Sequence, residues 1–557
     1  LGRPMMLPRT PVGKGQLSFA EVCRQEKSFN FAAAYDTRGD TWVYAWVHKR
    51  GALDKGSSDG GHDLVVMPHG GFPQVVISGA KSLSTPSFDS ERFIVAKDGT
   101  EAVVGSVTSL QVRTWFTLPA GETFEGAPTF EGDEVLFATS GGTPKRSRLH
   151  AIAAPAAVRD AAAGPADTAA APRRTLFTAE HGGGVLSWDR APVAPHNVLV
   201  VHRLANAMLA ELVLLTVSGD GAAATVTPRV LALDGRVEYC RPQAAFLADG
   251  TVVARLNLSS GEAKVGGMPR QVTHGLWQLD LKGLATAPAD APMEWTPLQL
   301  RVNFGGKKLW GPESVDEHGT YDVCSTSYGN AHGVREGFVL DPTRQRMAFT
   351  ARPHDPAHGM SDRLYLIDFE NGPEHANIQQ KGCYVPVALA EGGDLVYHFR
   401  SPTEAGDLWK CTTWSSNSLD ASSETSADRL THTMPPALRA KLSAPDELLV
   451  GGRHVLLFRP PPDASGAPKP ALVWAHGGPM TAVGFDYNPI ATWRAQRGRH
   501  GCLAVQATPV RATLQGPRRL YPSQRESSGR LRLRRPAVLT LRCHSHRAWP
   551  CIRLVTY

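Results

Sequence analysis

Pro470-Ala-Leu-Val-Trp-Ala-His-Gly-Gly-Pro479 is the stretch on which the interpretation of the whole chain depends. Its residues 471–475 form a short apolar run, which is typical of a strand buried on both faces of a parallel sheet. The two glycines that follow let the backbone approach a ligand with its N–H groups free, and the final proline stiffens the exit. Backbone N–H groups at such a place can stabilise the negative charge of a tetrahedral intermediate. We therefore expect one side of an oxyanion hole at His476, Gly477, Gly478 and Pro479.

The residues after this loop predict a helix and a second strand. Asn488 or Asp486 can cap a helix over residues 489–497, and Gly498 can end it. Residues 502–506 are again apolar and predict the next strand. A strand, a helix and a strand in this order indicate a doubly wound sheet, which binds ligands at the carboxyl ends of its strands.

Three segments carry a resemblance to a known family: Leu472–Pro479, Phe485-Asp-Tyr-Asn-Pro-Ile490 and Trp493-Arg-Ala-Gln-Arg-Gly498. They resemble the start of the catalytic domain of the prolyl oligopeptidase family of serine peptidases, on its acylaminoacyl-peptidase and dipeptidyl-peptidase side. The resemblance covers residues 443–498 well and the upstream region in architecture only. It implies a β-propeller followed by a C-terminal α/β-hydrolase domain, hydrolysis of short peptides by a Ser-Asp-His triad, and no cofactor or metal.

The pattern of that family stops after residue 506. No Gly-x-Ser-x-Gly follows Pro479, and no Asp follows Asp486, so the nucleophile, the acid and a credible base are missing from the printed sequence. One literal match exists far upstream, Gly56-Ser57-Ser58-Asp59-Gly60, but no apolar strand leads into it, and we interpret it as a surface turn. We name no catalytic residue and expect the chain as printed to lack peptidase activity.

Residues 29–440 repeat a loose unit of apolar strand, tight turn, apolar strand and amphipathic strand. The first strand pair is clearest at 127–137, 244–254, 338–349 and 387–397. Units that recur every 45 to 60 residues or so predict a propeller of about seven four-stranded blades. A β-sandwich, or two stacked small β domains, is the alternative. The two other His-Gly-Gly sequences, at 69–71 and 181–183, are predicted propeller turns.

Composition supports a turn-rich β protein with an ordinary globular core. Hydrophobic residues make up 42% and charged residues 20% of the chain, which also has 54 Gly and 42 Pro. The eight cysteines contain no Cys-x-x-Cys pair, which argues against a zinc site or a disulfide framework and favours free thiols. His354 and His358 have metal-ligand spacing, but Pro356 disrupts a helix there, so we interpret them as loop histidines. No apolar run is long enough to span a membrane, and we expect a cytoplasmic location.

The net charge of +7 comes from the end of the chain. Residues 499–557 contain twelve Arg, no Lys and one acid, so they carry +11 and leave −4 for the rest. Clustered arginines could bind nucleic acid, but aromatic residues for base stacking are few. A shifted reading frame or a retained intron would give the same composition, and we favour this explanation. We therefore expect no nucleic-acid partner.

Four segments follow from these patterns: an N-terminal segment (1–28), a β-propeller (29–440), the start of an α/β-hydrolase domain (441–506), and an Arg-rich tail expected to be disordered (507–557). The fold class is therefore mainly β, with an incomplete α/β-hydrolase domain after the propeller. Two functions stay open: a serine peptidase that lacks its triad in this chain, and a non-catalytic propeller that serves as a binding module.

Overall fold

A computed structural model describes the chain in segments. The described residues are 30–36, 41–49, 61–68, 71–89, 91–155, 173–194, 196–205, 210–219, 224–234, 243–256, 264–265, 268–269, 275–282, 284, 288, 293, 295–297, 321–323, 337–353, 361–369, 372–375, 380–412, 427–450, 453–459, 471–475, 484–488, 491–492, 501–505, 540–541 and 552–553.

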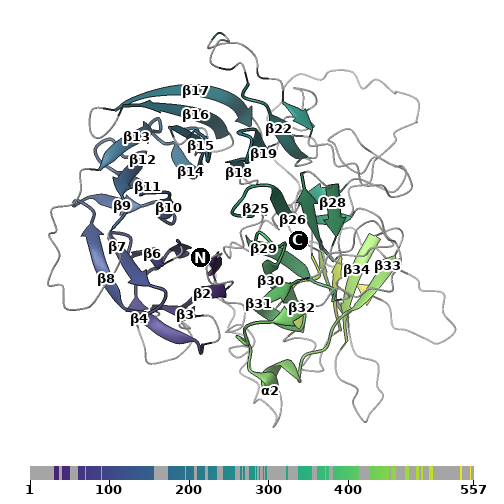
Figure 1. Ribbon diagram of the computed structural model, residues 1–557. Coiled ribbons are helices and arrows are strands. Elements are labelled where there is room, and N and C mark those ends of the chain that lie inside the picture. Colours follow the sequence, from purple (N-terminus) through teal and green to yellow (C-terminus); the bar gives the residue numbers. More distant parts are fainter. Residues whose placement is uncertain are drawn as a thin grey trace, which may run out of the picture.

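Seven antiparallel sheets succeed one another along these residues and lie around a common centre (Figure 1). Blade 1 consists of β1 (Asn30–Asp36), β2 (Thr41–Lys49), β3 (His62–Met67) and β4 (Gln74–Ala80). Blade 2 consists of β5 (Ser87–Phe88), β6 (Arg92–Lys97), β7 (Glu101–Ser106) and β8 (Val112–Thr117). Blade 3 consists of β9 (Glu122–Phe124), β10 (Thr129–Glu131), β11 (Glu134–Gly141), β12 (Arg146–Ala153) and β13 (Arg174–Thr178).

The next three blades follow the same order. Blade 4 consists of β14 (Gly184–Arg190), β15 (Asn197–Arg203), β16 (Ala210–Ser218) and β17 (Thr225–Asp234). Blade 5 consists of β18 (Gln243–Phe246), β19 (Val252–Leu256), β22 (Gly275–Leu279) and β23 (Thr296–Pro297), with the small hairpin β20 (Lys264–Val265) and β21 (Met268–Pro269) inserted. Blade 6 consists of β24 (Tyr321–Val323), β25 (Phe338–Leu340), β26 (Arg346–Pro353), β27 (Arg363–Asp368) and β28 (Gly372–His375).

Blade 7 completes the ring with β29 (Cys383–Leu389), β30 (Leu395–Ser401), β31 (Glu404–Cys411) and β32 (Ala427–Arg429). One apolar cluster joins it to blade 1: Phe31, Trp42 and Tyr44 from blade 1 pack with Ala390, Val396 and Leu408 of blade 7. Burying such side chains contributes roughly 1.5 to 3 kcal/mol each, so the two end blades are held together by their cores. The prediction of a seven-bladed propeller is confirmed, and the alternative of a β-sandwich or stacked β domains is wrong.

The turn residues explain why the strand pairs could be predicted. The hairpins β10–β11, β18–β19 and β29–β30 turn at Gly132, Gly250 and Gly393, whose φ angles of 64°, 85° and 92° suit glycine. The hairpin β25–β26 turns instead at Arg344, which has a φ of 58°. Its guanidinium donates two hydrogen bonds to Asp189 of blade 4, at 2.6 and 2.9 Å, and these contacts help to stabilise this uncommon conformation.

A separate four-stranded sheet follows blade 7. It has the order β33 (Asp446–Val450), β34 (Arg453–Phe458), β36 (Gly501–Val505) and β35 (Ala471–Ala475). The hairpin β33–β34 is antiparallel, whereas β35 and β36 are parallel, with Ala471 opposite Gly501 and Ala475 opposite Val505. The predicted strand at 471–475 is confirmed, and the strand predicted at 502–506 lies one residue earlier. The described residues show no α/β-hydrolase domain, so that part of the predicted fold stays a prediction.

Two further elements are short. Helix α2 (Pro436–Arg439) connects blade 7 to β33, and β37 (Thr540–Leu541) pairs with β38 (Ile552–Arg553). Among the residues placed by the structure, no helix has the length and apolar character needed to cross a membrane.

Candidate functional site

Strand β35 delivers the chain to the predicted oxyanion loop. The strand ends at Ala475, beside the end of its parallel neighbour β36. The carboxyl ends of parallel strands form the edge at which such sheets bind ligands. His476, Gly477, Gly478 and Pro479 themselves lie outside the described residues, so their role as oxyanion donors stays a prediction.

The segment that follows the loop packs on blade 7 of the propeller. Tyr487 belongs to one apolar cluster with Ala405 of blade 7 and with Met434, Leu438 and Leu442 of the connection through α2. Leu438 is the buried residue of that short helix. The chain before β33 and the chain after the predicted loop therefore meet at the same place on the propeller.

The helix predicted after this segment begins at Asn488. The Asn488 Oδ1 atom accepts a hydrogen bond from the Ala491 backbone N–H at 2.9 Å, as an N-cap residue does, and residues 491–492 are helical. Asp486 does not cap this helix, because its Oδ1 accepts from the Tyr487 N–H at 2.7 Å and its Oδ2 lies 3.0 Å from Arg400 Nη2. Of the two predicted caps, Asn488 is the one observed.

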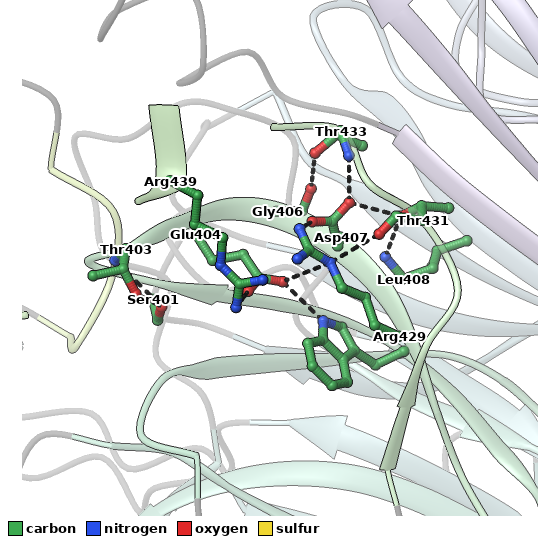
Figure 2. Close-up of polar contacts among 11 residues, drawn as sticks. Ser401, Thr403, Glu404, Gly406, Asp407, Leu408, Arg429, Thr431, Thr433 and Arg439 are labelled. Atoms are coloured by element: carbon green, nitrogen blue, oxygen red, sulfur yellow. Dashed lines mark hydrogen bonds and ion pairs between the residues drawn. The ribbon is translucent and has the colours of Figure 1, made fainter. Parts of the chain in front are cut away.

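A buried carboxylate, Asp407 in β31, is the centre of a polar network beside this junction (Figure 2). Its Oδ1 accepts hydrogen bonds from the Thr433 N–H at 2.7 Å and from the Thr431 hydroxyl at 2.8 Å. Its Oδ2 accepts from the Arg429 guanidinium. The Thr431 hydroxyl in turn accepts from the Leu408 N–H at 2.9 Å. Asp407 thus holds β32 and the chain that leaves it.

Glu404, at the start of β31, is the second buried acid of the network. Its Oε1 accepts a hydrogen bond from Trp409 Nε1 at 2.9 Å and lies 3.8 Å from Arg429 Nε. Its Oε2 lies 3.0 Å from Arg439 Nη2 at the end of α2. Burial raises the pKa of the Glu404 carboxyl, and the two guanidinium groups and the indole N–H oppose that rise.

The polar network around Asp407 and Glu404 is suited to stabilising the fold and not to catalysis. Both oxygens of Asp407 are used by donors, and Glu404 is 1% exposed, so neither acid can reach a substrate. The sequence gives little signal for it, since Glu404-Ala-Gly-Asp407 is polar and turn-like, and such acids are usually exposed. What marks these residues is contact with Arg429 and Arg439, which lie elsewhere in the chain.

Other candidate residues from the sequence can be placed only in part. The His181-Gly182-Gly183 turn lies between β13 and β14, as predicted, with His181 Nδ1 3.2 Å from the Lys145 carbonyl oxygen. Gly71 lies between β3 and β4, whereas His69 and Gly70 are outside the described residues. Ser58, His354 and His358 also lie outside them. Within the part of the chain that the structure describes, no group of three His, Cys, Asp or Glu side chains could hold a metal ion.

Comparison with solved structures finds likeness in fold to several peptidases. A puromycin-hydrolyzing peptidase of Mycobacterium tuberculosis matches 88% of this chain with a TM-score of 0.57 and 15% identity. Pyrococcus horikoshii acylaminoacyl peptidase matches 86% with a TM-score of 0.52 and 12% identity. Prolyl oligopeptidase B of Galerina marginata matches 88% with a TM-score of 0.50 and 9% identity.

No model of a protein family matches the chain, and no curated protein matches it by sequence. The match spans 67%, 65% and 64% of the three peptidases, or about two-thirds of their length. At such low identities the likeness concerns the fold alone. The chain has a β-propeller similar to that of prolyl oligopeptidase-family peptidases.

Proposed function

We propose that this chain supplies the propeller and the oxyanion side of a serine peptidase of the prolyl oligopeptidase family that hydrolyses short peptides. The observation that carries the proposal is the parallel pair β35–β36, which follows the propeller. Strand β35 is followed directly in the sequence by His476-Gly477-Gly478. The N–H groups of Gly477 and its neighbours would stabilise the oxyanion, and the propeller would exclude large folded substrates.

Hydrolysis would require a triad that these 557 residues do not contain. No Gly-x-Ser-x-Gly follows Pro479 and no Asp follows Asp486. Removing the triad from such a site leaves only the residual rate that binding and the oxyanion hole provide. The polypeptide of these residues alone is therefore expected to be inactive. A reducing compartment such as the cytoplasm fits a chain whose eight cysteines contain no Cys-x-x-Cys pair.

Sequencing the transcript across the codons for Arg494–Arg519, and on to its stop codon, tests the proposal. We expect a frame that continues into a Gly-x-Ser-x-Gly elbow, and a product whose elbow serine is labelled by a fluorophosphonate probe. The variant Ser58→Ala is the matched control and should be labelled as fully as the parent. A transcript that encodes residues 507–557 as printed, with no labelling of the product, would overturn the peptidase proposal.

The second candidate is a propeller that acts as a binding module. The ring of seven blades favours it, because the apolar cluster that joins blade 7 to blade 1 contains no residue of the sheet after blade 7. This function is expected if the printed tail is the encoded one and if the protein binds short peptides in equilibrium dialysis without cleaving them.

A further inference from the structure

We propose that Arg400 of blade 7 is a positioning residue for the site proposed above: it holds the chain that leaves the oxyanion loop against the propeller. The inference rests on the proposed function for its catalytic meaning. Its structural content concerns described residues only, namely Arg400 and the segment 484–488 with the helix start at 491–492.

The ion pair between Arg400 and Asp486 joins two parts of the chain that sequence analysis assigned to different domains. Arg400 lies in β30, opposite Cys383 of β29. Its Nη2 is 3.0 Å from Asp486 Oδ2, and each side chain is only 14% exposed. An ion pair shielded to this extent is screened less by salt than a surface pair, and loss of one partner removes a compensating charge from the other.

The residues on both sides of Asp486 are apolar and buried. Phe485 and Tyr487 are 6% and 5% exposed, and Tyr487 packs with Ala405 and Leu438. Apolar contacts of this kind are not directional and tolerate small shifts in packing. The ion pair requires that these two charged groups lie close together, so it favours one placement of the segment.

The position of this segment also determines where the helix capped by Asn488 begins. Asn488 caps the helix two residues after Asp486, and Ala491 and Thr492 in its first turn are buried. The eight residues 476–483 thus connect Ala475, paired with β36, to a segment held by blade 7. Arg400 thus acts on the segment 484–488 and, through the chain, on the loop that precedes this segment in the sequence.

Hydrogen exchange measured by mass spectrometry on the 557-residue protein tests this role. The variants are Arg400→Met, Asp486→Asn and the charge swap R400D/D486R. Arg346→Met is the matched control, since Arg346 Nε pairs with Asp368 Oδ2 of blade 6 at the same 3.0 Å, and its bond to the Glu391 carbonyl oxygen lies in the turn before β30, outside both sets of peptides. The readout is exchange in peptides covering 484–492, compared with blade 7 peptides covering 395–411.

We expect exchange in 484–492 to be at least about tenfold faster in Arg400→Met and Asp486→Asn, since loss of a hydrogen bond to a charged group raises the population of the locally open state by roughly that factor. The charge swap should restore most of the protection, and Arg346→Met should leave it unchanged. A purely structural role would instead speed exchange in 395–411 as well and would not be rescued by the swap.

Unchanged exchange of 484–492 in Asp486→Asn, or faster exchange without rescue by the swap, would overturn the inference. If Arg400→Met unfolds blade 7, the nearly isosteric Asp486→Asn still gives the answer. The outcome is separate from that of the peptidase test, because exchange needs no catalysis. The transcript sequence and the probe labelling can contradict the peptidase proposal while the exchange result supports the role of Arg400. The exchange result can likewise fail while the peptidase proposal is supported.

Discussion

Asp407→Asn should destabilise the protein more than any other single loss of charge at the junction after blade 7. Asp407 is fully buried and accepts hydrogen bonds from Thr431, Thr433 and Arg429. Asparagine has nearly the same volume and leaves no cavity. The substitution therefore removes the nearer of the two carboxylate charges beside the Arg429 guanidinium, the other being that of Glu404, and changes little else.

The size of the effect follows from these contacts. Loss of one partner of a buried ion pair costs about 3 to 5 kcal/mol of unfolding free energy. The amide oxygen of Asn can still accept from Thr433 or Thr431, which places the expected loss near the lower end, at about 3 kcal/mol. Glu404→Gln should cost only about 1 kcal/mol, because the amide oxygen keeps the Trp409 bond and because Arg439 is 39% exposed. The second cation, Arg429, lies 3.8 Å away and keeps its ion pair with Asp407.

Urea unfolding followed by far-ultraviolet circular dichroism measures both losses. Asp280→Asn is the control, since Asp280 is 59% exposed and lies 4.0 Å from Lys282, and it should change the unfolding free energy by less than about 0.5 kcal/mol. The reasoning is refuted if Asp407→Asn costs less than about 1 kcal/mol, or if Glu404→Gln costs as much as Asp407→Asn.

Two further predictions concern the propeller. Burial and the neighbouring Arg400 lower the pKa of His398 well below its usual value, so below pH 6.5 or so the unfolded state takes up a proton that the folded state refuses. His398 should therefore cost the parent about 2 kcal/mol of unfolding free energy between pH 7 and pH 5, and His398→Leu should not show this loss. Thermal melts at the two pH values test this, and an equal pH dependence in parent and variant would contradict it. Arg344→Met should cost about 2 kcal/mol, because Asp189 loses bonds of 2.6 and 2.9 Å. Burial raises the pKa of Glu131 to about 8, and the charge of Arg344 opposes that rise. The loss of unfolding free energy in Arg344→Met should therefore be larger at pH 9, where Glu131 is charged, than at pH 6. Urea titrations that give equal losses at both pH values would count against this.

Local signals explain the success of the sequence at the level of strands and blades. The pair β18–β19 was predicted because Asp249-Gly250 separates two apolar runs, and the structure turns there, with Gly250 at a φ of 85°. The same holds for the strand 471–475, whose apolar run is bounded by Pro470 and the His-Gly-Gly loop. In each case both the strand and its end are encoded within about ten residues.

The polar contacts between distant segments could not be predicted in the same way. Arg344 contacts Asp189 across 155 positions, and Arg429 contacts Asp407 across 22. Nothing in the local sequence distinguishes these residues from exposed charges, because their burial depends on how the blades meet. The cap at Asn488 was one of two local alternatives, and the contact of Asp486 with Arg400 decides between them.

The spacing of two threonines shows why the chain leaves blade 7 in one register. Thr431 is buried and Thr433 half-buried, whereas His432 between them is exposed, as alternation in an extended chain requires. Both threonines donate toward the same strand, Thr431 to Asp407 and Thr433 to the Gly406 carbonyl oxygen at 2.5 Å. A slip of one residue would turn the imidazole of His432 toward Asp407 and both hydroxyl groups away, leaving a buried carboxylate short of donors. Such a slip would also turn the buried Met434 outward, so apolar packing and the hydrogen bonds of Asp407 together set the register in which the chain leaves blade 7.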